Sequence, residues 1–258
     1  MRDLKISIVT VAYNSAATIG DTLASVATQT HTNIEHIVVD GASTDDTLAI
    51  VRRHSHVAKV ISEPDRGIYD AMNKGLALAG GDFIGFLNAD DMLASPGAAA
   101  SMARAASSAD VGAICGDLVY VRQDQPDQVI RYWRCGAFSA ARLRFGWMPP
   151  HPTFYLRRAL LPRIGAFDTS LRIAADYDFM LRCLSLPGMQ VGYVPEVLVR
   201  MRLGGASNRS LRAMWLKSRE DLQALHRSRV GGVFTLMCKN LRKLPQFLGT
   251  DHEAKRDE

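Results

Sequence analysis

The chain has 258 residues, 47% of them hydrophobic, which supports one main core with room for a smaller appendage. Lys and Arg number 31 against 26 Asp and Glu, for a formal net charge of +5, and the basic excess concentrates after residue 200. Four widely spaced cysteines without a CxxC pair give no indication of a zinc site or a disulfide framework, and they favour reduced thiols in a cytosolic protein.

We expect a soluble or peripheral protein. A strand pattern begins within a few residues of Met1, which leaves no room for the charged and apolar regions of a signal peptide. No apolar run reaches the roughly 18 residues that span a bilayer. The late basic excess suits an anionic membrane surface or a phosphorylated partner, and equally a solvated helix face.

Strand and helix patterns alternate along the first third of the chain. They predict strands over 6–11, 34–40, 57–62 and 83–87, and helices over 19–26, 47–51 and 68–78. This alternation indicates an α/β fold with a parallel sheet and right-handed crossovers. Ligands bind such sheets at the carboxyl ends of the strands, and polar residues follow each of these predicted strands.

The pattern is looser after residue 91. It predicts an alanine-rich helix over 96–109, a strand over 111–121, a hairpin turn at 123–127 and an irregular segment over 133–147. An extended proline-rich loop at 149–152 and a strand over 153–156 follow. The last predicted elements are a helix over 174–182, a strand over 191–199 that Pro195 interrupts, and helices over 210–226 and 234–244.

A carboxylate pair follows an apolar strand in the run Asn88-Ala89-Asp90-Asp91. Buried ionised carboxylates are costly unless a cation or a hydrogen-bond network compensates them. A divalent metal is one such compensation. The other interpretation is that these residues cap the helix beginning near Pro96, and the run alone leaves both open.

Five motifs in chain order resemble glycosyltransferase family 2. They are the segments 9–14 (VTVAYN), 38–45 (VVDGASTD), 62–75 (SEPDRGIYDAMNKG), 88–91 (NADD) and 176–178 (DYD). The resemblance covers about residues 6–202 and is nearest to bacterial transferases of exopolysaccharide or glycolipid assembly, the colanic-acid type among them. It implies an inverting nucleotide-sugar transferase with the GT-A fold, a Rossmann-like, mostly parallel sheet flanked by helices.

The resemblance also implies a domain organisation. We expect a GT-A catalytic domain over 1–205, with a nucleotide-binding half at 1–91 and an acceptor half at 92–205. A basic, amphipathic helical extension would follow over 206–258.

In the donor pocket that the resemblance implies, Thr10, Ala12 and Asn14 line the base and ribose, and Asp40 accepts a hydrogen bond from the base ring N–H. A carboxylate cannot donate, so Asp40 suits uracil, thymine or guanine, and we favour a UDP-sugar. Asp40 also fits a helix N-cap.

Arg66 and Lys74 are the implied phosphate-binding cations, although each also fits an ordinary surface charge. Asp70 lies four residues before Lys74 on one predicted helix, which suits an ion pair between the two.

Asn88-Ala89-Asp90 occupies the place of the family's metal-binding DxD motif, with Asn in place of the first acid. The resemblance implies that Asp90 binds Mg²⁺ or Mn²⁺ across the donor diphosphate, with Asn88 beside it and Asp91 on the ribose or the metal. Such a metal neutralises charge on the departing nucleoside diphosphate.

Inverting transfer needs one base to take the proton of the acceptor hydroxyl, and the resemblance assigns it to Asp176, where Ala175 replaces the usual Glu. Asp178 points elsewhere on the helix and suits a structural acid of its first turn. His151 suits a contact with acceptor or diphosphate, or a plain loop position.

The segment from Arg202 through Gly204, Gly205 and Ser207 resembles one that closes over the diphosphate. The departures at Asn88 and Ala175 keep open a non-catalytic, nucleotide-binding scaffold in a polysaccharide assembly complex. A nucleotidyltransferase is disfavoured, because residues 11–17 hold neither glycine nor a basic side chain.

The acceptor side and the tail carry aromatic and amphipathic patterns. Trp133, Phe138, Phe145 and Trp147 suit sugar stacking or lipid contact, and core packing is the usual alternative. The tail alternates basic with apolar residues, which is typical of an interfacial helix and also fits packing on the catalytic domain or in a homo-oligomer. The apolar residues are Phe234, Leu236, Met237, Leu241, Leu244, Phe247 and Leu248, and the basic residues are Lys239, Arg242 and Lys243.

We expect a saccharide or polyprenyl-diphosphate-linked acceptor at the cytoplasmic membrane face, and no nucleic acid.

Overall fold

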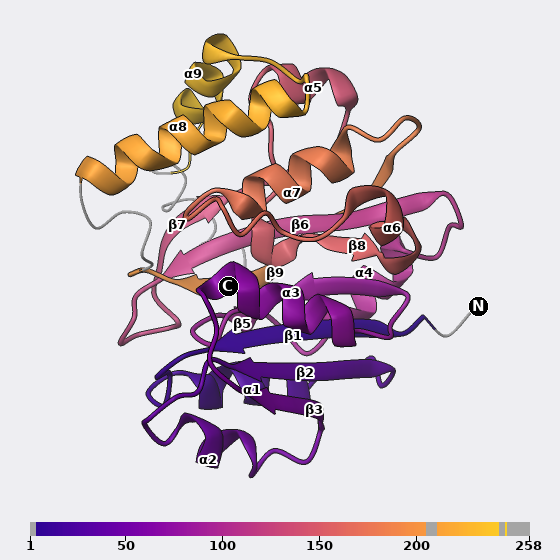
Figure 1. The fold of residues 1–258 in the computed structure, drawn as a ribbon. Coiled ribbons are helices and arrows are strands. Elements are labelled where there is room, and N and C mark those ends of the chain that lie inside the picture. The colour runs from indigo at the N-terminus through magenta and orange to yellow at the C-terminus, as the bar shows by residue number, and fades with distance from the viewer. Residues whose placement is uncertain (1–3, 205–210, 243–245, 247–258) are drawn as a thin grey trace.

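The computed structural model describes residues 4–204, 211–242 and 246 (Figure 1). Its strands are β1 (Ile6–Ala12), β2 (Ile34–Asp40), β3 (Val57–Ser62), β4 (Phe83–Phe86), β5 (Met92–Leu93), β6 (Val111–Val121), β7 (Val129–Trp133), β8 (Tyr155–Arg157) and β9 (Gln190–Arg202). Its helices are α1 (Ile19–Ala27), α2 (Thr47–Val51), α3 (Ile68–Leu78), α4 (Ala98–Ala105), α5 (Ala140–Arg144), α6 (Leu161–Ile164), α7 (Ala175–Leu184), α8 (Leu211–Arg227) and α9 (Val233–Leu241), with short 3-10 turns η1 (His151–Thr153) and η2 (Arg158–Leu160).

The strands form one sheet in the order β3-β2-β1-β4-β8-β6-β9-β5, with β7 paired to β6. The half from β3 to β4 is parallel, as the alternating pattern predicts. Beyond it β8 runs antiparallel to both β4 and β6, while β6 and β9 pair in parallel. The carboxyl ends of β1, β2, β3 and β4 therefore share one edge, where the predicted donor residues follow.

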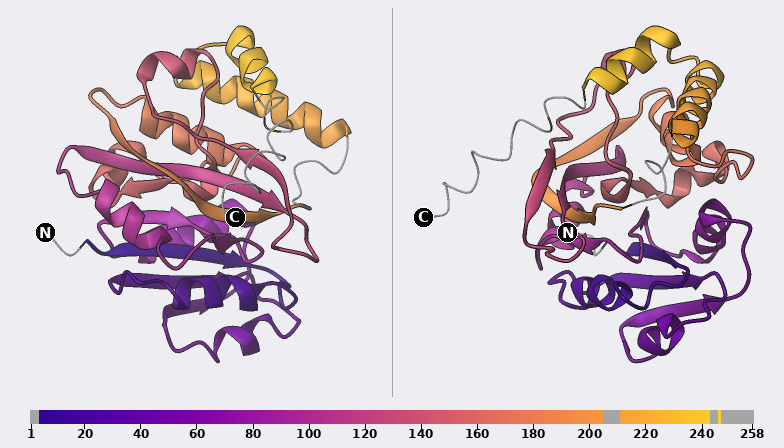
Figure 2. Two further views of the ribbon diagram at one scale, coloured as in Figure 1. Left: turned by 180° about the vertical axis from the view of Figure 1, so that it is seen from behind. Right: turned by 90° about the vertical axis from the view of Figure 1, so that its left-hand side faces the viewer.

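Helices cover both faces of the sheet (Figures 1 and 2). On one face α3 and α7 pack on a core that includes Val9, Val39 and Phe179. On the other face α1 and α2 cover β1 and β2, and α4 covers β6 and β9. The approach of α3 to β1 depends on Gly75, because a Cβ there would lie 2.3 Å from a Val9 methyl carbon.

Several local expectations need correction. The helix predicted over 96–109 is limited to α4, the irregular segment over 133–147 contains α5, and the strand predicted at 153–156 is β8. The proline-rich loop at 149–152 is not extended throughout, because it turns into η1. The fixed φ of Pro152 suits the first turn of a helix, and the buried Thr153 hydroxyl donates to the Gly116 carbonyl at 2.9 Å.

Strand β9 behaves as Pro195 predicts. Its pairing with β6 jumps from Val194 to Val197, which leaves residues 195 and 196 in a bulge. Proline has no N–H to give to the ladder, so the strand continues past it only with this irregularity.

The C-terminal helices extend the layer on α7. Helix α8 packs on α7 and α9 packs on α8, at the end of the molecule that is uppermost in Figure 1. The Thr235 hydroxyl donates to the Arg144 carbonyl at 2.9 Å, and a Cβ at Gly146 would lie 2.3 Å from the backbone nitrogen of Lys239. One side of α9 therefore packs closely on the loop after α5.

The other side of α9 is open to solvent. Val233, Phe234, Met237 and Leu241 are each 58–64% exposed. The tail residues 243–245, 247 and 248 lie outside the described residues. No helix in the described part of the chain is long and apolar enough to cross a membrane.

Candidate active site

The loops after β1 and β2 are tied together at the carboxyl edge of the sheet. Asn14, in the left-handed region with φ 47°, accepts the Thr44 N–H at 2.9 Å through its side-chain oxygen, and its own N–H donates to the Ser43 hydroxyl. The Ala12 carbonyl accepts the Gly41 N–H at 2.8 Å. The structure thus brings Ala12 and Asn14 together with the end of β2, where Asp40 lies.

Asp40 is fully buried and accepts three hydrogen bonds. Ser43 donates through both its N–H and its hydroxyl, and the Ser62 hydroxyl donates at 2.7 Å from the end of β3. The N-cap interpretation of Asp40 is wrong, because Asp46 holds that position in α2. The carboxylate instead links the ends of two neighbouring strands.

Thr10 shares one face of β1 with Ile6 and Ile8. It has no exposed surface, and its hydroxyl is 2.9 Å from the Nε2 atom of His36. Burial lowers the pKa of His36 to about 3, with further lowering by His56 and His54, so the imidazole is neutral near pH 7. The Thr10 side chain is therefore inaccessible from the carboxyl edge, and only its backbone belongs to the strand end.

Arg66 precedes α3 and Lys74 lies in its middle, and each forms an ion pair. The Arg66 guanidinium, 84% exposed, contacts Asp70 at 3.2 Å. Lys74 contacts Glu63 at 2.9 Å and donates to the Pro64 carbonyl. The expected Asp70–Lys74 ion pair is thus wrong. Both cations lie near the segment after β3, and the Arg66 side chain extends into solvent.

The turn after β4 concentrates unsatisfied oxygen atoms. The Asn88 amide donates to one carboxylate oxygen of the fully buried Asp91 at 3.1 Å. The remaining side-chain oxygen of each residue is buried without a hydrogen-bond partner among the described residues. Burial raises the pKa of Asp91 well above its usual range, with the Asp90 charge adding to the shift, and burial also raises the pKa of Asp90.

The capping interpretation of this turn is wrong. Strand β5 follows the turn directly, and Gly97 is the N-cap of α4. The carboxylates therefore have no helix end to satisfy, and their neighbour is a cation. Arg202, the last residue of β9, donates to the Asp90 carbonyl at 3.1 Å and contacts Asp21 at 2.5 Å.

Arg202 is itself buried, and its Nε lacks a partner within the described residues. Its guanidinium lowers the pKa of both Asp90 and Asp91, against the larger effect of burial. Of the segment expected to close over the diphosphate, Arg202 and Gly204 are described, whereas Gly205 and Ser207 lie outside the described residues.

The donor set of this turn fits a hard divalent cation. Two orphaned oxygens and the Asp90 carboxylate are the ligand type that Mg²⁺ and Mn²⁺ prefer. The described residues contain no cluster of three or more His, Cys, Asp or Glu side chains suited to a metal. A cation here would therefore depend on a phosphate-bearing ligand to complete its shell, as Mg²⁺ commonly does.

Asp176 lies in the first turn of α7 and is half-buried. The Tyr69 hydroxyl, from α3, lies 2.7 Å from the Ile173 carbonyl and 3.3 Å from an Asp176 oxygen. Asp178, by contrast, is buried and accepts a hydrogen bond from the Arg182 Nε at 2.8 Å. The two carboxylates point apart, as their spacing predicts, and Asp178 pairs with Arg182 within α7.

Glu220 of α8 caps the start of α7. Its carboxylate, 5% exposed, accepts the backbone N–H groups of three successive residues, Arg172, Ile173 and Ala174, at 2.9–3.0 Å. These are donors that the chain entering a helix leaves free. A residue from the C-terminal extension thus fixes the turn that carries Asp176.

Asp176 faces a cavity of about 1140 Å³ between the sheet and the C-terminal helices. Trp133 and Trp147 line it, whereas Phe145 is 55% exposed and Phe138 lines a different cavity. The cavity also contains basic side chains from several elements, namely Arg131, Arg134, Lys217, Lys239 and Arg242.

His151 connects the cavity to the turn after β4. It lines the cavity, and its ring stacks on Phe86 with 5.7 Å between centroids. Burial lowers the pKa of His151, and the nearby Asp176 charge opposes this shift. His151 is therefore not a plain loop residue, and it lies between the strand that leads to Asp90 and the carboxylate of Asp176.

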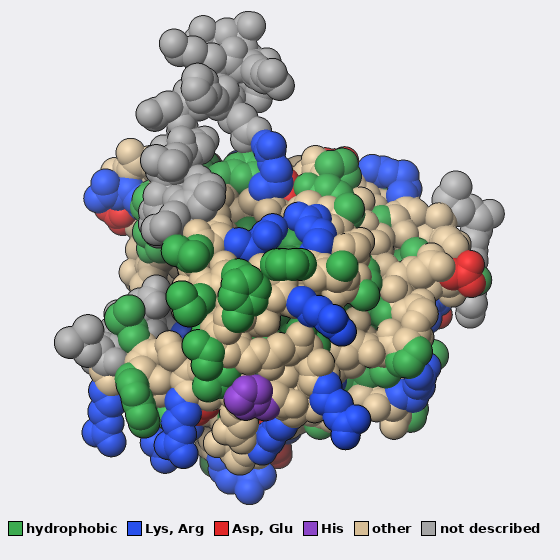
Figure 3. Space-filling model, turned by 90° about the horizontal axis from the view of Figure 1, so that it is seen from above, with side chains coloured by type: hydrophobic (Ala, Val, Ile, Leu, Met, Phe, Trp, Pro, Cys, Tyr) green, Lys and Arg blue, Asp and Glu red, His purple; other side chains and the backbone are tan. Residues whose placement is uncertain are grey.

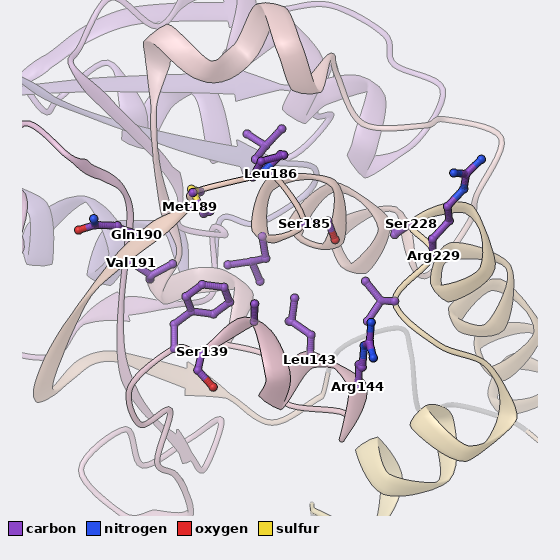
Figure 4. A pocket seen from close by; sticks show the side chains of 16 residues that line it. Ser139, Leu143, Arg144, Ser185, Leu186, Met189, Gln190, Val191, Ser228 and Arg229 are labelled. Carbon is purple, nitrogen blue, oxygen red and sulfur yellow. The ribbon is translucent and has the colours of Figure 1, made fainter.

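A second cavity, of about 680 Å³, lies on the other side of the C-terminal layer (Figure 4). Side chains of α5, of the loop after α7 and of the end of α8 surround it, among them Leu143, Leu186 and Ser228. Phe138, predicted for the acceptor side, lines it, but none of the predicted donor, metal or catalytic residues does, so it is separate from the candidate site.

Motif spacing does not identify several residues that shape this site. Tyr69 lies inside the motif at 62–75, but the motif alone gives it no role. Glu220 carries no local signal, because its partners precede it by about fifty residues. The thiols of Cys115 and Cys135, twenty residues apart, lie 3.2 Å from each other in the core, where the pKa of Cys135 is raised by its contact with Cys115 and by burial.

Comparisons with known proteins show the family and the fold of the chain. The profile described as "Glycosyl transferase family 2" matches residues 7–173. A PGL/p-HBAD biosynthesis glycosyltransferase of Mycobacterium tuberculosis is 34% identical over 221 residues, 82% of each chain. The O-antigen biosynthesis protein RfbC of Myxococcus xanthus is 31% identical over 219 residues, 80% of this chain and 16% of that protein.

Solved structures share the fold at lower identity. S. aureus TarS in complex with UDP-GlcNAc has a TM-score of 0.66 at 20% identity, over 96% of this chain and 79% of that one. The Pyrobaculum calidifontis mannosyltransferase PcManGT in complex with GDP-Man and Mn²⁺ has a TM-score of 0.65 at 21% identity, over 96% and 74%. The fold is thus that of GT-A glycosyltransferases, and by its sequence the chain belongs to glycosyltransferase family 2.

Proposed function

We propose that this glycosyltransferase moves a sugar, with inversion, from a nucleotide-sugar donor to a saccharide carried on a polyprenyl diphosphate. One observation carries the proposal. The turn Asn88–Asp91 holds two buried oxygens without partners among the described residues, and His151, which stacks on Phe86 just before this turn, lines the cavity that Asp176 faces. A diphosphate-binding edge and a carboxylate base are the two parts that inverting transfer requires.

The donor would lie along the carboxyl edge of β1 to β4. The loops that Asn14 and Asp40 order form its floor, and the Tyr13 ring, 63% exposed beside Gly41, is available to stack on a planar base. TarS and PcManGT bind UDP-GlcNAc and GDP-Man, respectively, which supports a nucleotide-sugar donor here. We favour a UDP-sugar, as in the TarS complex with UDP-GlcNAc. Asp40 has no exposed surface and already accepts three hydrogen bonds, so it orders the floor of the donor site and does not contact the base.

Asp90, Asp91 and Asn88 would hold Mg²⁺ or Mn²⁺ together with the donor diphosphate. The titles of two related structures, PcManGT and the glucosyl-3-phosphoglycerate synthase of Mycobacterium tuberculosis, include Mn²⁺. When bound, the metal supplies Lewis-acid stabilisation of the leaving diphosphate. Arg202, buried beside the same turn, adds positive charge where the phosphates would lie.

Asp176 would accept the proton of the attacking acceptor hydroxyl. Tyr69 contacts its carboxylate, and Glu220 holds the preceding backbone, so the carboxylate keeps one orientation toward the cavity. Ala175 is fully buried in the core and leaves Asp176 as the carboxylate of this turn that faces the cavity.

The acceptor would enter from the side of α8 and α9. Three of the five basic side chains that line the cavity, Lys217, Lys239 and Arg242, come from this side, which suits a phosphorylated carrier. Hydrophobic and basic side chains intermingle on the face seen in Figure 3, and few acidic ones appear on it. We therefore place the enzyme at the cytoplasmic membrane surface, with the exposed side of α9 against the lipid.

The test is calorimetric titration of the purified protein with UDP, GDP and dTDP, with and without Mn²⁺. We expect one nucleotide, UDP, to bind more tightly with metal, and Asp90→Ala to remove the metal effect. Release of nucleoside diphosphate from the donor should be lost in Asp176→Asn. No binding of any nucleotide under either condition would contradict the proposal and favour a non-catalytic scaffold.

A further inference from the structure

The cavity that Asp176 faces contains a second buried carboxylate with an unused oxygen. Asp221 of α8 is 2% exposed and lines the cavity. One of its oxygens contacts the Lys239 ammonium at 2.7 Å, and the other, Oδ1, has no partner among the described residues. A buried acceptor without a donor is unfavourable, so Oδ1 calls for a ligand group that donates.

Close contacts hold the Asp221 carboxylate and its Lys239 partner in place. The Lys239 ammonium is 3.3 Å from the centroid of the Tyr177 ring, so it lies between the ring face and the Asp221 carboxylate. Tyr177 follows Asp176 directly in α7. The backbone of Lys239 is held in turn by its close approach to Gly146.

The charges around Asp221 select the kind of donor. Lys239 and Lys217 both line this part of the cavity, and a further cation would be repelled by them. An anion would meet the Asp221 and Asp176 carboxylates. A neutral hydroxyl donates a hydrogen bond without either conflict, and it is the group that a sugar presents.

We propose that Asp221 binds a hydroxyl group of the acceptor sugar through Oδ1, and that Lys239 and Tyr177 hold the carboxylate in position. This inference rests on the proposed transferase function and assigns its acceptor as a sugar rather than an aromatic or lipid hydroxyl. It also makes the two C-terminal helices part of the acceptor site.

The test uses methyl glycosides of common hexoses and deoxyhexoses, added to protein loaded with UDP and Mg²⁺ and followed by saturation-transfer NMR. We expect at least one glycoside to bind the wild-type protein and to bind Asp221→Asn about ten- to hundredfold more weakly, the usual effect of losing a hydrogen bond to a charged group. Arg227→Gln is the matched control, because it removes an ion pair of α8 with Asp168 outside the cavity and should keep glycoside binding.

A second variant separates binding from folding. Asp221→Asn leaves the Lys239 ammonium buried without its carboxylate, whereas Asp221→Asn/Lys239→Met removes both charges. We expect the double variant to recover the thermal midpoint lost in the single variant and not to recover glycoside binding. Recovery of both would mean that Asp221 serves only to hold α9, and would overturn the subsite.

The outcomes also separate this inference from the transferase proposal. A wild-type protein that binds UDP with Mn²⁺ but no glycoside, or glycoside binding that survives Asp221→Asn, overturns the subsite alone. Failure to bind any nucleotide overturns the proposed function, and the subsite with it.

Discussion

At the scale of single residues, the departure from the usual acidic pair at Asn88 has a structural consequence. Its amide donates to Asp91 and so offsets part of the repulsion in a turn where burial already raises the pKa of both acids. An amide oxygen remains free beside the carboxylates. The substitution therefore lowers the charge of the turn while keeping an oxygen ligand in place.

Asn88→Asp should reverse this balance. We expect Mn²⁺ to bind about tenfold more tightly in the presence of UDP, because an added carboxylate attracts the cation directly. Without metal, the thermal midpoint should fall, since three neighbouring acids then repel one another. Calorimetry and thermal unfolding with and without Mn²⁺ measure both effects, and Asn88→Ala serves as the control, with weaker metal binding. Equal affinity in Asn88→Asp and wild type would contradict a metal role for this position.

His36 should make folding stability depend on pH. Its folded pKa of about 3 lies below the ordinary histidine value of 6.5, so the unfolded state binds more protons between these values and stability falls as the pH drops from 6.5 toward 3. Between pH 7 and pH 5 we expect a loss of about 2 kcal/mol from this residue, measured by urea unfolding. His36→Gln should show a smaller loss, whereas the exposed His226→Gln should retain it.

Residue roles at the site were only partly predictable. The motif residues Asn14, Asp40 and Asp90 follow strand ends, and a parallel sheet brings such ends to one edge. The orientation of Thr10 was readable too, because alternation along β1 places it with Ile6 and Ile8 on one face. The ion pairs of Arg66 and Lys74 depend on loop geometry that spacing along a helix does not contain.

At the scale of elements, short-range patterns predicted most of the boundaries, since periodicity and breakers act within a few residues. Strand β8 shows what they cannot supply. Its insertion between β4 and β6 depends on partners about forty and seventy residues away. The capping of α7 by Glu220 of α8 also depends on residues far apart in the sequence. It makes the C-terminal extension structurally part of the proposed site.

Glu220→Gln tests this capping. We expect a loss of about 2–3 kcal/mol in stability, because an amide replaces a carboxylate that accepts three backbone N–H groups. The kcat should fall while the affinity for UDP stays unchanged, since the donor edge is remote from α8. Glu196→Gln alters an exposed acid that accepts a hydrogen bond from the Ser101 hydroxyl, and it is the control that should change neither. An unchanged kcat in a destabilised Glu220→Gln would limit the residue to a folding role.

At the scale of the whole molecule, the strands β1 to β3 and helix α9 lie at different ends (Figures 1 and 2). Residues of α7, α8 and α9 line the cavity that Asp176 faces, which we propose as the acceptor site. The exposed apolar surface of α9 extends to the loop after α5. There the ring of Phe145 lies edge to face with that of Phe234, with 6.3 Å between ring centroids. An exposed apolar surface of this kind with basic neighbours is typical of membrane contact. A lipid-borne acceptor would then reach Asp176 while its carrier stays in the bilayer.

Phe234→Ser/Leu241→Ser should separate membrane contact from chemistry. Both side chains are about 60% exposed, so their loss should leave the thermal midpoint within the small range expected for surface changes. We expect binding to vesicles that contain anionic lipid, measured by flotation, to weaken at least about tenfold, because burial of each apolar side chain contributes more than 1 kcal/mol. Transfer to a soluble glycoside should persist. Val60→Ser, an exposed apolar residue of β3 at the opposite end, is the matched control and should float as wild type does. If the α9 variant floats equally well, α9 contacts protein rather than lipid, and the basic cavity alone must account for recognition of the carrier.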